Sequence, residues 1–272
     1  MVAMRLVIAV TILAAVAGDA RADAPSPASD ALEVSYAVDG TVTAVGGMSY
    51  VVVAFALQDV LAPAACRWCA DNAFDAGVRD ALVWDDAAAA NAWSNITAYG
   101  LGAGSAFGLG LIAARANGED ELWPKDALII LEAVAVAADV NQIAKLSFAR
   151  QRPFVHARGG SGAEATADDN LSFYSGHTSF AFAMATASGT VATLRGYHLA
   201  PLIWGVGLTA AAATGYLRIA ADKHYATDVL AGAVVGSATG ILIPILHRGH
   251  SRAHITATIL PGVTVVALRT RF

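Results

Sequence analysis

The stretch RIAADKHYATD, residues 218–228, places an Arg, two Asp, a Lys and a His between two long apolar segments. Within it His224 and Asp228 are four residues apart, so on a helix the carboxylate can accept a hydrogen bond from the imidazole. Such a bond fixes the tautomer and leaves the other ring nitrogen as a lone-pair nucleophile or base. Arg218 lies off that helical face, which predicts a turn between it and His224. Alone, an H-x-x-x-D pair is more common as a surface ion pair.

Two further cations occur in KLSFARQRPF, where Lys145 and Arg152 are two helical turns apart. They point the same way from a helix end, and Pro153 then stops the helix. Two cations on one face suit a phosphate group, because Arg can bind two of its oxygens. The alternative is the positively charged flank of a membrane helix.

A third stretch, FYSGHTSFAFAMA, predicts that a helix opens at Ser175 and Gly176. A helix N-terminus with a glycine offers bare N–H groups to an anion, and His177 would stand beside that anion. The alternative is a capped helix with an incidental histidine.

All three stretches adjoin the ends of apolar helices, and counting the spans puts these ends on one face of a bundle. Two histidines, three fixed cations and one aspartate on that face predict a phosphate site that needs no metal.

This ordered set of motifs resembles the signature of the type 2 phosphatidic acid phosphatase (PAP2) superfamily, shared with bacterial non-specific acid phosphatases and vanadium haloperoxidases. The family pattern is K-x6-R-P, then P-S-G-H, then S-R-x5-H-x3-D, and all its spacings are intact over roughly residues 126–246. Tyr174 stands where the family has Pro and Leu217 where it has Ser. These two departures bear on cavity shape or substrate preference.

The resemblance implies a metal-independent phosphatase in which His224 attacks phosphorus and forms a phosphohistidine. Asp228 would orient His224, and His177 would protonate the leaving oxygen and then help to activate water. The implied phosphate-binding residues are Lys145, Arg152, Arg218, Ser175 and Gly176. No cofactor is implied, and vanadate would bind only to a haloperoxidase-like protein or as an inhibitor.

The composition favours a membrane-embedded helical bundle. Of the 272 residues 56% are hydrophobic and 14% charged, against a usual charged share of about 25%. A net charge of −5 provides no basic surface for nucleic acid. Uncharged or nearly uncharged helical segments of spanning length are expected at 87–114, 126–146, 178–194, 196–217 and 229–246. An Ala-rich soluble helical protein is the alternative.

The expected fold is all-α: a PAP2-like integral-membrane bundle with short β-hairpins at both ends. LEVSYAVDGTVTAV, residues 32–45, alternates around an Asp-Gly turn, and the C-terminal segment has a second turn at Pro261–Gly262. The expected domains are a signal peptide at 1–22, a linker and hairpin at 23–47, the phosphatase domain at 48–247 and a basic tail with hairpin at 248–272.

Residues 1–22 resemble a cleaved secretory signal, with an uncleaved anchor helix as the alternative. Cys66 and Cys69 are then predicted to form a small structural disulfide. Basic residues flank the helix ends opposite the site, which predicts a bacterial inner-membrane protein whose site faces the periplasm. A periplasmic or outer-membrane-associated protein is the alternative. A cleaved signal together with a periplasmic site requires an even number of spans before Lys145, which predicts five spans in all with 48–62 not crossing. Pairing of the two terminal hairpins would instead require an even total.

Polar residues outside the motifs leave alternatives open. Glu132 and Asp139 share one helical face, which either lines a substrate cavity or meets water or a neighbouring helix. Gly232, Gly236 and Gly240 predict close helix packing. The tail HRGHSRAH suits a basic membrane flank better than a metal site.

The leading prediction is a membrane phosphatase acting on a lipid phosphate or diphosphate, of the phosphatidate or polyprenyl diphosphate type. The alternatives are a soluble periplasmic acid phosphatase acting on small phosphoesters, a vanadium haloperoxidase, and a non-catalytic membrane packing or transport protein.

Overall fold

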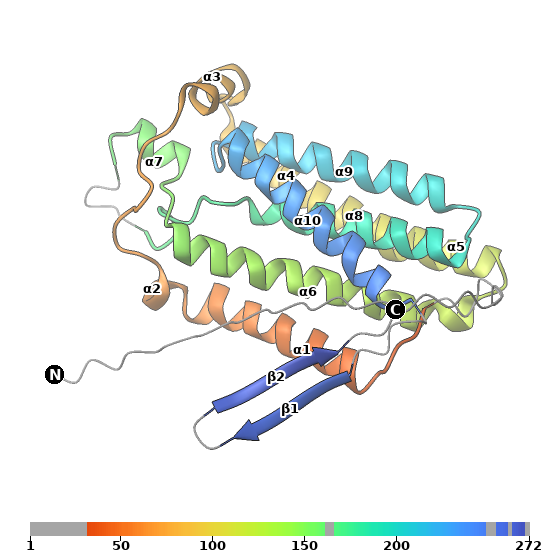
Figure 1. Ribbon diagram of the computed structural model, residues 1–272. Helices are drawn as coiled ribbons and strands as arrows, with labels where there is room; N and C mark the ends of the chain where they lie inside the picture. Colours follow the sequence, from red (N-terminus) through yellow and green to blue (C-terminus); the bar gives the residue numbers. More distant parts are fainter. Residues whose placement is uncertain (1–31, 161–165, 249–253, 261–262, 270–272) are drawn as a thin grey trace.

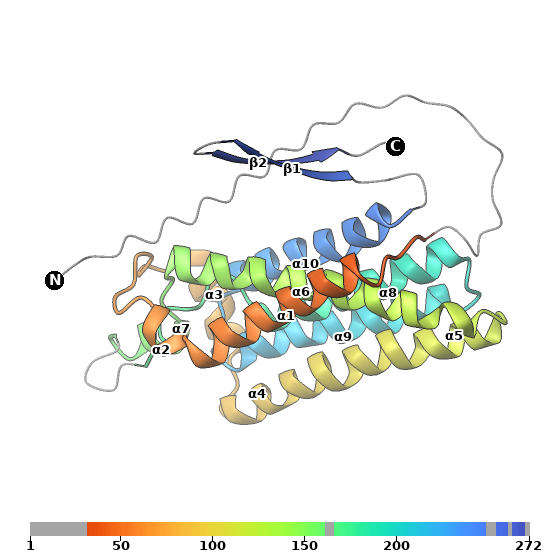
Figure 2. The ribbon, with the colours of Figure 1, turned by 90° about the horizontal axis from the view of Figure 1, so that it is seen from below.

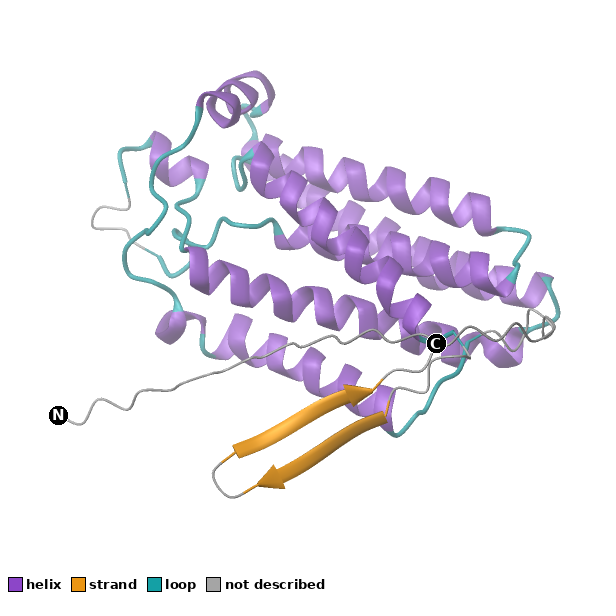
Figure 3. Ribbon diagram, in the orientation of Figure 1, coloured by secondary structure: helices purple, strands orange, loops and turns teal. Residues whose placement is uncertain are grey.

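Long helices that run side by side make up most of the chain (Figures 1 and 3). The structure is a computed structural model that describes residues 32–160, 166–248, 254–260 and 263–269. The helices are α1 Val38–Val51, η2 Val52–Ala56, α2 Gln58–Leu61, α3 Ala73–Leu82, α4 Ala87–Asn95, η3 Ile96–Gly102, η4 Gly104–Leu109, α5 Gly110–Ala116, η5 Asp120–Leu122, α6 Trp123–Phe148, α7 Pro153–Ala157, α8 Gly176–Arg195, α9 Ala200–Ala220 and α10 Ala226–Leu246. The strands are β1 His254–Leu260 and β2 Val263–Arg269.

Five helical segments within the described residues are long and apolar enough to cross a membrane: 38–56, 87–116, 120–148, 200–220 and 226–246. Their outward faces carry exposed apolar side chains such as Ile143, Val234 and Leu242. These features point to a membrane protein, as the composition predicts.

Helix α8 is not among the five segments, although the sequence predicts a span there. It lies at the centre of the bundle, in contact with α6, α9 and α10, and most of its residues are buried. Because neighbouring helices cover it, α8 can carry Thr and Ser in place of large apolar side chains. It still runs alongside the spanning helices (Figure 1).

The predicted N-terminal hairpin is wrong, because α1 occupies residues 38–51. The Asp-Gly pair lies in the first helical turn, where the Asp39 carboxylate accepts the Ser35 N–H at 2.7 Å. Residues 48–62 do not stand apart from the bundle as a non-crossing segment either. Helix α1 continues into η2 and packs along α6 (Figure 2). A backbone in lipid must satisfy its own hydrogen bonds, which favours one continuous helix over an isolated hairpin.

The two ends of the helical region therefore meet at one end of the bundle. The Glu33 N–H donates to the His247 carbonyl at 2.8 Å, and Leu32 forms an isolated bridge with Arg248. Counting α8 and α1, the described chain runs along the bundle six times, in alternating directions.

Helix α10 approaches α8 closely along its glycine face. A Cβ atom at Gly232 would lie 2.7 Å from the Ser175 carbonyl oxygen, and Cβ atoms at Gly236 and Gly240 would also meet α8 backbone. The glycines thus bring the start of α10 against the start of α8, as predicted from their spacing.

Glu132 and Asp139 both serve contacts between helices. Asp139 accepts a hydrogen bond from Ser49 of α1 at 2.6 Å, and Glu132 pairs with His247 at 3.0 Å. Of the two interpretations of this face, the structure supports the neighbouring-helix one.

The C-terminal strands pair antiparallel, from His254↔Arg269 to Leu260↔Val263. Their expected turn at Pro261–Gly262, and the signal peptide and linker expected at 1–31, lie outside the described residues.

Candidate active site

Four helix ends meet at the end of the bundle opposite residues 32–38. Lys145 lies in the last turn of α6, Gly176 opens α8, Arg218 lies in the last turn of α9, and His224 lies in the turn before α10. The structure therefore brings the three sequence motifs together.

Arg152, the first residue before α7, is fixed by acceptors on two loops. Its guanidinium donates to the Asp168 carboxylate at 2.6 Å, the Asp168 carbonyl at 3.0 Å and the Lys223 carbonyl at 2.8 Å. Burial alone would raise the pKa of Asp168, but the cations Arg152 and Lys145 outweigh burial and lower this pKa to about 2. Asp168 is therefore an ionised anchor that the sequence motifs do not include.

His224 is nearly fully buried, and its hydrogen bonding decides its tautomer. Arg152 Nη1 lies 3.3 Å from His224 Nε2. Because a guanidinium can only donate, Nε2 accepts this bond and carries the lone pair. The proton then resides on Nδ1. Burial, together with the nearby cations Arg152, Arg218 and Lys145, lowers the pKa of His224 well below its usual value.

Asp228 lies near His224 without the predicted hydrogen bond between them. Its Oδ2 is 3.7 Å from His224 Nδ1, beyond hydrogen-bond distance. This oxygen accepts instead from Ser172 Oγ at 2.6 Å and from the Tyr225 N–H at 3.0 Å. The carboxylate can still stabilise positive charge on the imidazole at this distance.

Arg150, which the sequence analysis missed, holds the other side of Asp228. Its guanidinium is fully buried and pairs with Asp228 at 2.6 Å and with Asp75 of α3 at 2.7 Å. It lies between two aromatic rings, 4.0 Å from the centroid of Trp68 and 4.1 Å from that of Tyr225. The only sequence signal was its alternation with Arg152 in the loop after α6.

The predicted disulfide joins Cys66 and Cys69 and encloses Trp68 in a short loop. This loop lies at the same end of the bundle as the site, because Trp68 bridges to Arg150 through the backbone and stacks on its side chain. The disulfide thus supports the residues behind Asp228.

Polar residues in the second half of α4 form a further part of the site that no sequence motif includes. Arg218 donates to Asn91 at 2.6 Å and to Ser94 at 3.1 Å. His177 Nε2 lies 2.8 Å from Asn95 Oδ1 and 3.3 Å from the Tyr99 hydroxyl. The available signal was three polar residues at helical spacing in an otherwise apolar span.

The opening of α8 packs tightly against α6. A Cβ atom at Gly176 would lie 2.8 Å from Asn141 Oδ1 and 3.7 Å from Lys145 Nζ, so a side chain there would fill the space before the ammonium. Ser175 occupies the N-cap position, but its hydroxyl pairs with Thr178 at 2.9 Å and its N–H donates to the Asp228 carbonyl at 3.1 Å. The Ser175 N–H is thus not available to an anion in this state.

The assembled site has two fixed guanidinium groups, a lysine ammonium and an imidazole lone pair directed toward one region. Such an arrangement binds a tetrahedral oxyanion and presents a nucleophile to its central atom.

Comparisons with known proteins agree with this chemistry. Residues 126–252 match the model of the PAP2 superfamily. The chain is also 33% identical over 131 residues to a lipid A 1-phosphatase of Porphyromonas gingivalis. The aligned part covers 46% of this chain but only 25% of that protein. No solved structure matches this chain.

Proposed function

Because residues 126–252 match the model of the PAP2 superfamily, we propose that this protein is a membrane phosphatase that hydrolyses a phosphomonoester or diphosphate of a lipid. The observation that carries the proposal is the contact between Arg152 and His224 Nε2, since it directs an unprotonated imidazole nitrogen into a cluster of cations. Arg152 would transfer its hydrogen bond to a phosphate oxygen when substrate binds.

In the first step, the Nε2 lone pair of His224 forms a bond to phosphorus while the bond from phosphorus to the leaving oxygen breaks. A proton from His177 goes to that oxygen. Lys145, Arg152 and Arg218 neutralise the charge on the other phosphate oxygens.

In the second step, water forms a bond to phosphorus and gives its proton to His177. The bond between phosphorus and Nε2 then breaks, and its electron pair returns to His224. The products are the dephosphorylated lipid and inorganic phosphate. Asp228 stabilises the positive charge on the phosphorylated ring, and Arg150 and Ser172 hold that carboxylate in position.

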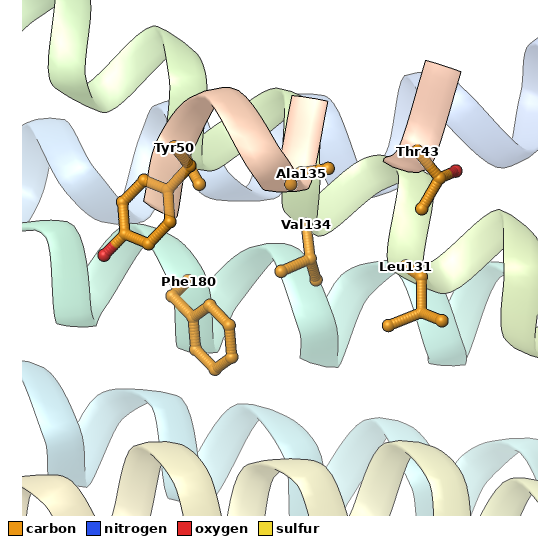
Figure 4. Close-up of a pocket in the computed structure, with 8 residues that line it drawn as sticks. Thr43, Tyr50, Leu131, Val134, Ala135 and Phe180 are labelled. Atoms are coloured by element: carbon orange, nitrogen blue, oxygen red, sulfur yellow. The ribbon is translucent and has the colours of Figure 1, made fainter. Parts of the chain in front are cut away.

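A cavity between α1, α6 and α8 supports a lipid substrate. Its volume is about 190 Å³, and its lining residues are Thr43, Gly47, Tyr50, Leu131, Val134, Ala135, Ala138 and Phe180 (Figure 4). Phe180 packs against Tyr99 with ring centroids 5.1 Å apart, and Tyr99 packs against His177 at 5.2 Å. An apolar chain in this cavity would place its head group toward the site. The curated relative, a lipid A 1-phosphatase by name, also acts on a lipid.

We further propose that the site faces the periplasm of a bacterial inner membrane. Disulfides persist in oxidising compartments, and the Cys66–Cys69 disulfide lies at the site end of the bundle. With six alternating helices, residues 32–38 then lie on the cytoplasmic side. A cleaved signal peptide would instead leave residues 32–38 in the periplasm and the site in the cytoplasm, so it is incompatible with a periplasmic site. The disulfide favours the periplasmic site.

The test is phosphate release by the purified protein in detergent from phosphatidate, polyprenyl diphosphate and a soluble phosphoester. We expect turnover of a lipid, and loss of at least about 10³-fold in the His224→Ala variant. Denaturing the enzyme rapidly at alkaline pH, where a phosphohistidine is stable, should trap phosphate on the wild type and none on this variant. No release from either lipid would refute the lipid phosphatase. Release from the soluble ester alone would assign the protein to the small-phosphoester class.

A further inference from the structure

Three side chains that can bind metal ions meet at the end of the bundle opposite the phosphate site. They are Asp39 in the first turn of α1, Glu132 in α6 and His247 directly after α10. One ligand atom of each lies within 4.8 Å of the other two. Figure 1 shows the start of α1 and the end of α10 at the same end of the bundle.

The hydrogen bonds of His247 fix its tautomer. Its Nδ1 lies 2.8 Å from the Glu33 carbonyl oxygen, and a carbonyl can only accept, so Nδ1 carries a proton. Nε2 lies 3.0 Å from Glu132 Oε2, so either a proton or a bound cation lies between these two atoms. A lone pair and a carboxylate oxygen repel each other unless something positive lies between them.

The surroundings add negative charge and are partly enclosed. The side chains of His247 and Glu132 are only 10% and 12% exposed. Asp39 Oδ2 accepts the Ser35 N–H, which leaves Oδ1 for another partner. Two carboxylates and one imidazole nitrogen therefore converge in a largely enclosed place.

We propose that Asp39, Glu132 and His247 bind a divalent transition-metal cation of the Zn²⁺ type. One imidazole and two carboxylates are suitable ligands for such an ion, with water in the fourth position. A ligating histidine that donates its other N–H to a backbone carbonyl is the usual supporting arrangement. Two ligands of one zinc ion lie roughly 3.3 Å apart, so a small rotation of the Asp39 side chain completes the site.

The bound ion would join the start of α1 to α6 and to the end of α10. It lies at the far end of the bundle from His224 and takes no part in phosphate chemistry. Its function is to hold together the end of the bundle where the helical region begins and ends.

The experiment uses the full chain without a histidine tag, in detergent and freed of metal by a chelator. Zn²⁺ is titrated by calorimetry, and the unfolding temperature is measured with and without Zn²⁺. We expect one ion per chain and a higher unfolding temperature. Glu132→Gln and Asp39→Asn should each weaken binding at least about tenfold while the helical circular dichroism remains. Asp39→Asn is the variant to rely on if Glu132→Gln does not fold.

The matched control is the double variant His250→Ala with His254→Ala, which removes the other histidines of the tail. It should bind Zn²⁺ like the wild type. The proposal is overturned if the wild type binds no Zn²⁺ stoichiometrically, since His247 and Glu132 would then form an ion pair only. It is equally overturned if the control loses binding while Asp39→Asn retains it.

Discussion

The lone pair of His224 Nε2 is kept available by burial and by the cations around it. In the proposed mechanism the neutral imidazole is the nucleophile, and its fraction falls only when the pH drops through its pKa. Because this pKa is lowered, we expect the acidic limb of kcat/KM to lie below the usual histidine value of 6.5. Asp168, with a pKa of about 2, stays ionised over this range and adds no limb.

The measurement is kcat/KM for a lipid phosphate from pH 4.5 to 8, corrected for the separately determined ionisation of the substrate. A limb centred at or above pH 6.5 after this correction would contradict the assigned state of His224.

Arg150 is the buried residue whose loss should cost most. It neutralises Asp75 and Asp228, and the side chains of all three are 0% exposed. Arg150→Met would leave two carboxylates buried without a cation. We expect a loss of about 3–5 kcal/mol in the free energy of unfolding, measured by chemical denaturation in detergent.

Arg115→Met is the matched control, because Arg115 lies exposed in the last turn of α5. It should change stability by less than about 1 kcal/mol. Equal losses in both variants would show that the buried ion pairs of Arg150 do not contribute more to the free energy of unfolding than an exposed arginine does.

At the scale of elements, α1 and α6 form two walls of the apolar cavity. Ala138→Phe should fill it and lower kcat/KM for a long-chain lipid phosphate about tenfold, while turnover of a soluble phosphoester stays unchanged. The physical reason is that a long chain loses its binding volume, whereas a small ester does not use it.

Val140→Phe is the control for this element, because Val140 lies on α6 outside the cavity and is 39% exposed. It should leave both substrates unaffected. If Ala138→Phe slowed both substrates alike, the cavity would not be the lipid-chain site.

For the molecule as a whole, the proposed topology of six alternating helices puts the two ends of the bundle on opposite sides of the membrane. In a chain with Cys66 and Cys69 changed to Ser, we expect Asp80→Cys to react with an impermeant maleimide from the periplasm. Glu121→Cys should react only after lysis. Asp80 lies in α3 beside the site, and Glu121 lies between α5 and α6 at the far end. The reverse pattern would place the site in the cytoplasm and favour a cleaved signal peptide.

The motif residues and most of the helices that carry them could be predicted from local sequence patterns. Lys145, Arg152, Gly176, Arg218 and His224 adjoin helix ends because apolar runs of spanning length stop where charges begin. Such local patterns depend on backbone hydrogen bonding and hydropathy, which neighbouring residues decide.

The side chains that support the motifs could be identified only once the helices were assembled. Arg150, Asp75, Asn91 and Asn95 act through partners far away in the chain, and no local pattern encodes those distances. The Asp-Gly pair at residues 39–40 is a hairpin signal locally, yet packing of the whole apolar segment against α6 makes it helical. Contacts between distant segments outweigh the local preference for a turn there. The reason is that the burial of apolar side chains and the pairing of backbone hydrogen bonds depend on the assembled bundle.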